Sequence, residues 1–408
     1  MSASSTPARA ATLLRHPPFQ FYLWARGLSE FAYQMAAVAV GWQVYALTNS
    51  AFALGMIGLT QFLPTLLLVF IAGHAADRFD RKRVVQICRV VEGLAAMFLA
   101  WGSIEGWLNV TGIFAAVAVF GTAIAFESPA QASLLPAVVP DGMVQKGTAF
   151  STSVWQFAVI SGPAAGGFAY AVSPGFTYAA MTLIWLLAAI LNGAIRLKQP
   201  VVEREPPSLA AVFDGVHFVR RNPAILGTIS LDLFAVLLGG ATALLPIYAR
   251  DILHIGPWGL GMLRAAPAVG ALLMTMVLAH HALNRRVGIR MFQAVIVFGA
   301  ATVVFALSRS IWLSLVALFV MGAADTISVV IRASLVQLRT PDAMRGRVSA
   351  VNYLFINASN QLGEFRSGVT AALFGAVPSA VLGGVGTMAV ALLWMKLFPA
   401  LRKLERME

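Results

Sequence analysis

From residue 19 almost to its end, the chain alternates long apolar stretches with short polar ones. A helix needs about 20 predominantly apolar residues to cross a bilayer, and segments of that length recur throughout. Six lie in the first half of the chain, at 19–45, 51–72, 84–104, 108–139, 147–171 and 176–195. Six more lie in the second half, at 224–248, 258–279, 291–307, 312–338, 348–372 and 378–399. The pattern predicts an all-α polytopic membrane protein with 12 transmembrane helices.

The composition agrees with a membrane environment. Hydrophobic residues make up 59% of the 408 residues, charged residues only 11%, and mean hydropathy is +0.79. Soluble domains carry about 25% charged residues, so this chain is solvated mainly by lipid. The net charge of +12 comes from basic residues dispersed between apolar segments, which indicates membrane orientation rather than nucleic-acid binding. The single cysteine, Cys88, excludes a disulfide framework and a cysteine metal site.

Lysine and arginine are divided unevenly between the two sets of connections. They crowd the tails and the connections that follow even-numbered spans, whereas the opposite connections hold only Arg250 and Arg309. Because basic residues mark the cytoplasmic side, the tails at 1–18 and 401–408 are predicted to be cytoplasmic. Residues 1–18 also lack the short apolar run of a secretory signal, so we expect an uncleaved first helix.

The longest polar connection, 198–222, divides the chain near its middle, between predicted six-helix bundles at 19–197 and 223–400. After a Pro/Glu-rich spacer, Ser208 begins a predicted helix with one apolar face, made of Leu209, Val212, Phe213, Val216 and Val219. This pattern fits an interfacial helix, and a solvated linker is the alternative. Blocks 132–143 and 333–344 share Ala-Ser-Leu, then Pro-Asp and Met, at the same spacing. They predict a duplication, as in transporters whose two repeats rock around a central site.

Residues 73–83 (GHAADRFDRKR) are a dense charge cluster between two apolar spans. Such a cluster cannot lie in hydrocarbon, so it is a short turn at a membrane face. The pattern Gly-x-x-x-Asp-Arg-x-x-Arg-Lys resembles the loop between helices 2 and 3 of the major facilitator superfamily of secondary transporters. The resemblance implies a conformational latch formed by Gly73, Asp77, Arg78, Arg81 and Lys82. Asp80 stands where the family usually has glycine, and positive-inside anchoring alone is the alternative interpretation.

A second motif lies in the fifth span, at 161–167 (SGPAAGG). Gly162 and Gly166 are one helical turn apart and give a smooth face for close helix packing. The run resembles the Gly-Pro-x-x-Gly-Gly antiporter motif of superfamily exporters, carried here by Gly162, Pro163, Gly166 and Gly167. Ordinary small-residue packing is the alternative. Segments 126–130 and 361–368 further resemble the exporter branch that contains the enterobactin exporter and macrolide efflux proteins, a similarity that runs over nearly the whole chain.

Several predicted spans carry ionisable residues. One central charge costs about 3 kcal/mol on insertion scales, so such residues face a cavity or a partner. A carboxyl group removed from water tends to take up a proton, which is the property that a proton-coupled carrier needs. The candidates for proton coupling are Glu30, Asp232, Asp325, Glu127 and Glu364. Their candidate charge partners are Arg26, Arg332 and Arg366.

Among the carboxylates, Glu30, Asp232 and Asp325 are the leading candidates, because they lie closest to mid-span on helices that line the cavity in the superfamily. Static pairing is the alternative. Arg26 lies four residues before Glu30, and a second such pair, Arg89 with Glu92, is predicted in the third span. The polar residues of the first, fifth and eleventh spans predict a water-filled cavity lined by Tyr33, Gln34, Gln156, Asn357, Asn360 and Gln361.

The sequence offers no phosphate loop, hydrolase elbow or histidine cluster with metal-ligand spacing, so neither an enzyme nor a bound cofactor or metal is predicted. We predict a bacterial-type inner-membrane protein with the major facilitator fold, functional as a monomer in the lipid bilayer. Its predicted partners are protons and a small amphipathic substrate, siderophore or drug-like, which it exports by proton-coupled antiport. A uniporter or importer of the same fold, and a lipid-handling or receptor-like membrane protein, are the alternatives.

Overall fold

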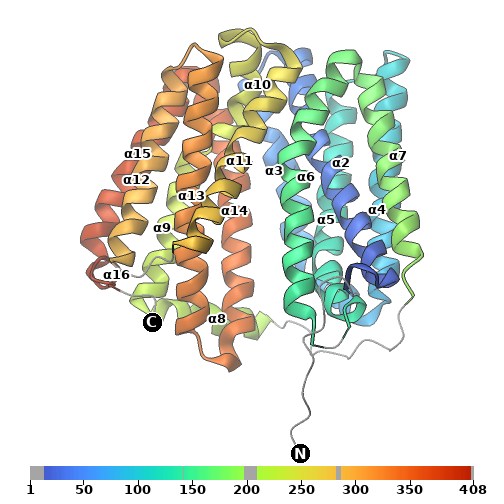
Figure 1. Ribbon diagram of the computed structural model, residues 1–408. Coiled ribbons are helices and arrows are strands. Elements are labelled where there is room, and N and C mark those ends of the chain that lie inside the picture. The colour runs from blue at the N-terminus through green and yellow to red at the C-terminus, as the bar shows by residue number, and fades with distance from the viewer. Residues whose placement is uncertain (1–12, 141, 197–208, 282–285, 406–408) are drawn as a thin grey trace, which may run out of the picture. The chain divides into compact units, whose positions relative to one another are not determined.

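The computed structural model describes residues 13–140, 142–196, 209–281 and 286–405, and the regular structure in these ranges is entirely helical (Figure 1). The first half contains α2 (Pro17–Thr48), α3 (Ala51–Arg78), α4 (Arg81–Ile104), α5 (Val110–Val138), α6 (Val144–Val172) and α7 (Pro174–Gly193). The second contains α8 (Leu209–Arg221), α9 (Pro223–Gly239), η1 (Ala241–Leu244), α10 (Leu245–Ile247), η2 (Tyr248–Ile252), α11 (Gly256–His280), α12 (Val287–Leu307), α13 (Ile311–Arg339), α14 (Asp342–Phe374), α15 (Ala376–Leu397) and α16 (Pro399–Arg402).

Within the described residues, 9 helices are long and apolar enough to cross a membrane, the segment from α9 to η2 counting as one. Helices α2, α6 and α14 are also long, at 32, 29 and 33 residues, but too polar for the same criterion. The all-α membrane-spanning fold predicted from the sequence is therefore confirmed. The three polar helices are the ones that carry Glu30, the Gly-Pro motif and the predicted polar run, and in a bilayer such surface has to turn away from lipid.

Side-chain caps explain where several helices begin. Asp80 precedes α4 and accepts a hydrogen bond from the amide of Lys82 at 3.0 Å. Asn109 caps α5 and Ser173 caps α7, each accepting from the amide three residues later. An N-cap of this kind satisfies one of the otherwise unpaired donors at a helix start and is worth about 1 kcal/mol. The Asp80 cap shows how the turn accommodates aspartate where the resembling family has glycine.

The chain divides into two compact units whose boundaries cut through helices. Unit 1 contains Met1–Ala37, Leu63–Gly162 and Val172–Pro206, and unit 2 contains Val38–Phe62, Pro163–Ala171 and Pro207–Glu408. Helices α2, α3 and α6 therefore contribute to both units. In α3 and α6 a proline, Pro64 or Pro163, lies at or next to the boundary. The division into bundles at 19–197 and 223–400 follows different boundaries and stays a prediction.

In unit 1, helix α4 packs closely against α5 and α7. The Trp185 side chain of α7 is 0% exposed, and its ring lies 5.2 Å from that of Phe120 on α5, centroid to centroid. Gly93 of α4 permits this approach, because a Cβ there would lie 3.2 Å from the Leu186 side chain. The result is a closely packed three-helix core in which any buried charge is far from solvent.

In unit 2, helices α9, α12, α13 and α15 lie side by side around one apolar core that includes Leu231, Phe292, Ile331 and Ala391 (Figure 1). Helix α9 ends at Gly239, and the chain continues through the short turns η1, α10 and η2. An interrupted helix leaves carbonyl groups without intrahelical donors. Here the Arg366 guanidinium donates to the Leu238 carbonyl, and the Thr387 hydroxyl donates to the Ala235 carbonyl at 2.9 Å.

The predicted linker helix is present as α8, and it packs against protein. Val219 is 3% exposed and belongs to a cluster with Ile225 of α9, Val336 of α13 and Val348 of α14. Asp214 of α8 forms an ion pair with Arg347 of α14 at 3.0 Å. The apolar positions Leu209, Val212 and Phe213 have side chains outside the described residues. Part of the apolar face is thus covered by α9, α13 and α14.

Candidate functional site

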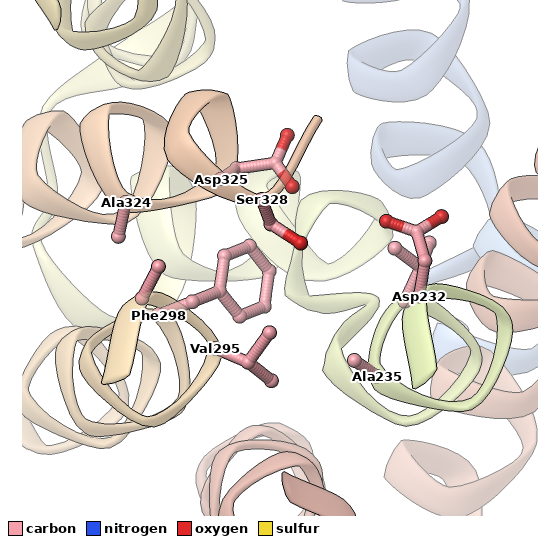
Figure 2. Close-up of a pocket in the computed structure, with 9 residues that line it drawn as sticks. Asp232, Ala235, Val295, Phe298, Ala324, Asp325 and Ser328 are labelled. Carbon is pink, nitrogen blue, oxygen red and sulfur yellow. The ribbon is translucent and has the colours of Figure 1, made fainter. Parts of the chain in front are cut away.

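A small pocket in unit 2 brings together two of the predicted carboxylates. Asp232 of α9 lines it together with Asp325 and Ser328 of α13, and the remaining lining residues are apolar (Figure 2). The Ser328 side chain is 3% exposed, and its hydroxyl has no hydrogen-bond partner among the described residues. Figure 2 shows this hydroxyl directed into the space between the two carboxylates. The pocket is therefore a small polar site within an otherwise apolar bundle.

Asp232 also forms an ion pair with Arg332 of α13, and both side chains are almost fully buried, at 6% and 5% exposed. Removing one partner from a buried pair leaves an uncompensated charge, which costs several kcal/mol. The sequence singled out both residues, one as a carboxylate and the other as a charge partner, and the structure places them in contact. For Asp325, by contrast, no ion pair to a described residue is present.

Helix α14 presents the remaining predicted residues of unit 2. Glu364 lies opposite Gly58 of α3, and it interacts electrostatically with Arg264 of α11. The Gln361 side chain also faces Gly58, and its carbonyl oxygen has no partner among the described residues. Asn357 donates to the backbone carbonyl of Tyr353 one turn earlier, and Asn360 is exposed. Arg366, a predicted charge partner, binds the Leu238 carbonyl described above.

Contacts inside unit 2 also join helix ends from the two halves of the sequence. The Tyr45 hydroxyl donates to the Asp251 carboxylate, and Arg250 donates to the Tyr45 carbonyl at 3.3 Å. The Arg250 guanidinium lies over the Tyr45 ring, 5.5 Å from its centroid. These residues join the end of α2 to η2.

Two glycine pairs bring helix backbones together in the same unit. A Cβ built on Gly368 of α14 would lie 2.5 Å from the Cα of Gly55 on α3. A Cβ built on Gly167 of α6 would lie 3.1 Å from the Cα of Gly261 on α11. Both contacts require glycine, and both connect a first-half helix to a second-half helix.

Unit 1 carries its own cluster of buried charges. Arg89 of α4 pairs with Glu127 of α5, with 3.1 Å between Nε and Oε1, and the Arg89 side chain is 1% exposed. Glu92, one turn further along α4, is 2% exposed and lacks a partner for its Oε2 among the described residues. The predicted pairing of Arg89 with Glu92 is therefore wrong, because the guanidinium turns to the neighbouring helix instead.

The first span shows a different arrangement from the one its spacing suggested. Glu30 accepts a hydrogen bond from Gln34 at 2.8 Å, and Arg26 donates to the Ser151 hydroxyl of α6 at 2.6 Å and to Tyr22. The alternative of a static ion pair between Arg26 and Glu30 therefore has no direct contact to support it. The other two cavity candidates of these helices, Tyr33 and Gln156, are half-buried.

The predicted turn at 73–83 is shorter in the structure, because α3 continues to Arg78 and α4 begins at Arg81. The residues of this segment differ in their surroundings. Gly73 and Arg81 are buried, Arg78 is exposed, and the side chain of Asp77 lies outside the described residues. Lys82 donates to the Ile195 carbonyl at 2.8 Å, and Asn192 of α7 donates back to the Lys82 carbonyl at 2.8 Å. Lys82 thus fixes the start of α4 to the end of α7 within unit 1.

The Gly-Pro motif of α6 makes close contacts at both of its ends. In unit 1, a Cβ on Gly162 would lie 2.6 Å from the Gln34 Cβ and 3.0 Å from the Phe31 carbonyl of α2. In unit 2, Gly167 meets α11 as described, and Pro163 and Gly166 are buried. The motif therefore lies in closely packed surroundings at every position.

A family model described as transmembrane secretion effector matches residues 8–408. The chain belongs to this family of the major facilitator superfamily. The enterobactin exporter EntS of Citrobacter koseri is 27% identical over 413 residues, which cover 100% of this chain and 98% of the exporter. EntS of Escherichia coli is 25% identical over 411 residues, with the same coverage of 100% and 98%.

Solved structures of transporters share the fold. The D-xylose-proton symporter superimposes with a TM-score of 0.71 at 15% identity, covering 94% of this chain and 98% of the symporter. The nucleoside transporter NupG gives 0.70 at 12% identity, covering 93% and 99%. At these identities the likeness shows the fold alone. Together with the family match, it makes the chain a secondary transporter with the major facilitator fold and not an enzyme.

Four residues of these sites were missed by the sequence interpretation. The sequence predicts a static pair for Glu92 and no role for Ser328, Arg264 or Asp251. A lone arginine in the eighth span, at position 264, was a usable signal, because an intramembrane charge marks a functional position by default. No sequence signal distinguished Ser328 from the other hydroxyl residues of α13.

Proposed function

We propose that this transporter exports a small amphipathic molecule across a bacterial inner membrane in exchange for protons. The single observation that carries the proposal is the pocket in which Asp325 and Ser328 face the buried Asp232–Arg332 pair. Asp325 is half-buried, and a carboxyl group that lies inside a transmembrane bundle without an ion pair to a described residue is suited to bind and release a proton. Loss of the proton from Asp325 would place a second negative charge beside the Asp232–Arg332 pair, where it would compete with Asp232 for Arg332 and so bias the packing of α9 against α13.

The energetics suffice for useful export. At a membrane potential of ~150 mV, one entering proton supplies ~3.5 kcal/mol from the electrical term. At ~1.4 kcal/mol per tenfold concentration ratio, this supports a gradient of a few hundred-fold. Exchange of one proton per substrate molecule is therefore enough to drive export against such a gradient.

Alternating access would use the contacts that join first-half helices to second-half helices within unit 2. Tyr45 with Asp251, Gly55 with Gly368, and Gly167 with Gly261 gather the ends of α2, α3 and α6 onto α11, η2 and α14. By the distribution of Lys and Arg, these ends lie on the periplasmic side and both termini in the cytoplasm. Release of substrate outward would separate them. We propose that a monomer completes this cycle.

The substrate class is proposed from the relatives. Two of them are named as enterobactin exporters and match the chain end to end, which favours a siderophore or a drug-like molecule of similar amphipathic character. The polar surface of α14 suits a ligand that combines hydroxyl or carboxylate groups with apolar rings.

Everted membrane vesicles from a strain deleted for its own efflux pumps provide the test. With a panel of catecholate siderophores and macrolides, energised vesicles should accumulate at least one compound, and a protonophore should abolish the uptake. Asp325→Asn should lose proton-driven uptake yet keep substrate counterflow, whereas Glu105→Gln, which changes an exposed carboxylate at the end of α4, should behave as wild type.

Uptake that survives the protonophore would overturn the antiport and leave a uniporter. Absence of transport with the whole panel in proteoliposomes would favour a lipid-handling or receptor-like role.

A further inference from the structure

Unit 1 contains a group of buried polar atoms that its ion pair does not satisfy. Glu92 has an Oε2 without a partner, Arg89 has an unpartnered Nη1, and Trp185 has an unpartnered Nε1, all within the described residues. Their residues are 2%, 1% and 0% exposed. Arg89 and Glu92 are one turn apart on α4, and Trp185 packs beside Gly93, the residue after Glu92. Buried polar atoms are almost always hydrogen-bonded, so these three atoms mark a place where the described side chains leave polar groups unsatisfied.

The charges around Glu92 do not balance if every acid is ionised. Glu127 of α5 and Glu30 of α2 both act on Glu92 electrostatically, and Arg89 opposes them. Arg26 of α2 is hydrogen-bonded to Ser151 and Tyr22.

In the part of the chain that the structure describes, the other neighbours of Glu92 supply no positive charge. Helix α7, packed along the whole of α4, carries no charged residue, and its titratable side chain is Tyr178. Cys88 of α4 is also buried and uncharged as a thiol. One buried arginine thus faces more than one carboxylate.

The ion pair decides which acid is neutral. Arg89 satisfies Glu127 directly, at 3.1 Å. An ionised Glu92 would be a buried charge with no hydrogen-bonded partner, which is far more costly than a buried neutral acid. Glu92 is therefore the acid that holds a proton in this conformation.

We propose that Glu92 is a proton-binding site of unit 1, separate from the pocket of Asp232 and Asp325, with Arg89 as the group that responds to its occupancy. When the Glu92 O–H bond breaks, the proton leaves to water and the carboxylate keeps the electron pair. The unpartnered Nη1 of Arg89 can then donate a hydrogen bond to the Glu92 carboxylate. The guanidinium would then bind a carboxylate on α4 as well as one on α5, and the ion pair between Arg89 and Glu127 would weaken. A role for this proton in transport rests on the proposed proton-driven export.

Infrared spectroscopy of the whole protein in lipid tests the protonation without any substrate. Compared with wild type, Glu92→Gln should lose one carboxyl equivalent of the protonated C=O stretch, and Glu105→Gln should lose none. Each variant is first shown to be monodisperse and to unfold cooperatively. An unchanged band in folded Glu92→Gln overturns the proposal.

A measurement on the wild-type chain covers the case in which Glu92→Gln does not fold. Dicyclohexylcarbodiimide, a lipid-soluble reagent that attacks protonated carboxyl groups, should modify Glu92 as read by peptide mass spectrometry, and the yield should fall as pH rises. Adducts on other buried acids with none on Glu92 contradict the proposal.

The transport arm is read separately. If export is proton-driven, Glu92→Gln should release one proton fewer per substrate than Glu105→Gln does, while Glu92 protonation can be established even if export fails. An unchanged proton count with a confirmed infrared change would show that Glu92 binds a proton outside the transport cycle, and would overturn its coupling role.

Discussion

The contact between Gly55 of α3 and Gly368 of α14 allows a direct test of conformational control. A Cβ on Gly368 would lie 2.5 Å from the Gly55 Cα, 2.7 Å from its nitrogen and 2.8 Å from the Ala51 carbonyl oxygen. Ordinary Cβ contacts lie at 3.4–4 Å. A Gly368→Ala substitution must therefore push the two helices apart by roughly 1 Å, since all three atoms it meets are backbone and cannot rotate away.

The free-energy cost falls on one conformation only. Overpacking of this kind costs about 1–3 kcal/mol, and it is paid only while α3 and α14 are in contact. A differential penalty of that size shifts a two-state equilibrium by roughly 5- to 150-fold. We therefore expect Gly368→Ala to populate the conformation in which these helix ends are separated, and Gly368→Leu to do so more strongly.

Pulsed electron paramagnetic resonance measures this shift. Spin labels at Leu47→Cys on α2 and Phe374→Cys on α14, both exposed and both in unit 2, report the separation of the helix ends. Cys88 is the only native cysteine and is replaced by alanine in the background. Gly368→Ala should add a longer-distance population to the distribution.

The matched control for this experiment is Gly346→Ala on the same helix. A Cβ at that position would meet nothing within 4 Å. Its distance distribution should match that of the parent. Distributions that are the same for Gly368→Leu and Gly346→Ala, in protein that remains folded, would refute the reasoning.

Two further predictions concern the polar contacts of unit 2. Tyr45→Phe removes the hydrogen bond to Asp251, a charged but half-exposed acceptor, so we expect it to destabilise the arrangement in which the helix ends are in contact by about 1 kcal/mol. The spin-label distances should shift in the same direction as for Gly368→Ala but less. A shift toward shorter distances would contradict this. Arg332→Ala or Asp232→Ala should each lower stability by about 3–5 kcal/mol, because each strands a buried charge. The double variant should recover part of that loss in thermal unfolding, and a fully additive double variant would show that the pair is not coupled.

The fold could be predicted because each transmembrane segment reports its own length and polarity. The same local reasoning succeeded for α8, whose apolar spacing is visible from Ser208 onward. The predicted spans fall on long helices, except that 224–248 falls on the interrupted segment from α9 to η2, and 9 of the described helices meet the length and hydropathy of a membrane span. It failed where the partner lies on another helix. The spacing of Arg89 and Glu92 predicts an ion pair within α4, but in the structure Arg89 forms its ion pair with Glu127, 38 residues away on α5.

The candidate site shows the same limit. Asp232 and Arg332 were both recognised as costly intramembrane charges, but nothing in the sequence said that they meet, because only the packing of α9 on α13 brings them together. The sequence predicts a carboxylate as the partner of Arg366, but in the structure Arg366 binds the Leu238 carbonyl where α9 ends. The Gly239-Gly240 pair at this break does not by itself distinguish a helix end from close helix packing. Burial and unpartnered polar atoms, which identify Glu92, can be seen only in the three-dimensional structure.

The prolines near the unit boundaries have a mechanical consequence. Pro64 in α3 and Pro163 in α6 each remove one rung of the helical hydrogen-bond ladder beside the place where the helix passes from one unit to the other. A helix that lacks one backbone hydrogen bond bends more easily at that point than elsewhere along its length. Replacing either proline with alanine restores the missing hydrogen bond and should therefore stiffen the helix beside the unit boundary.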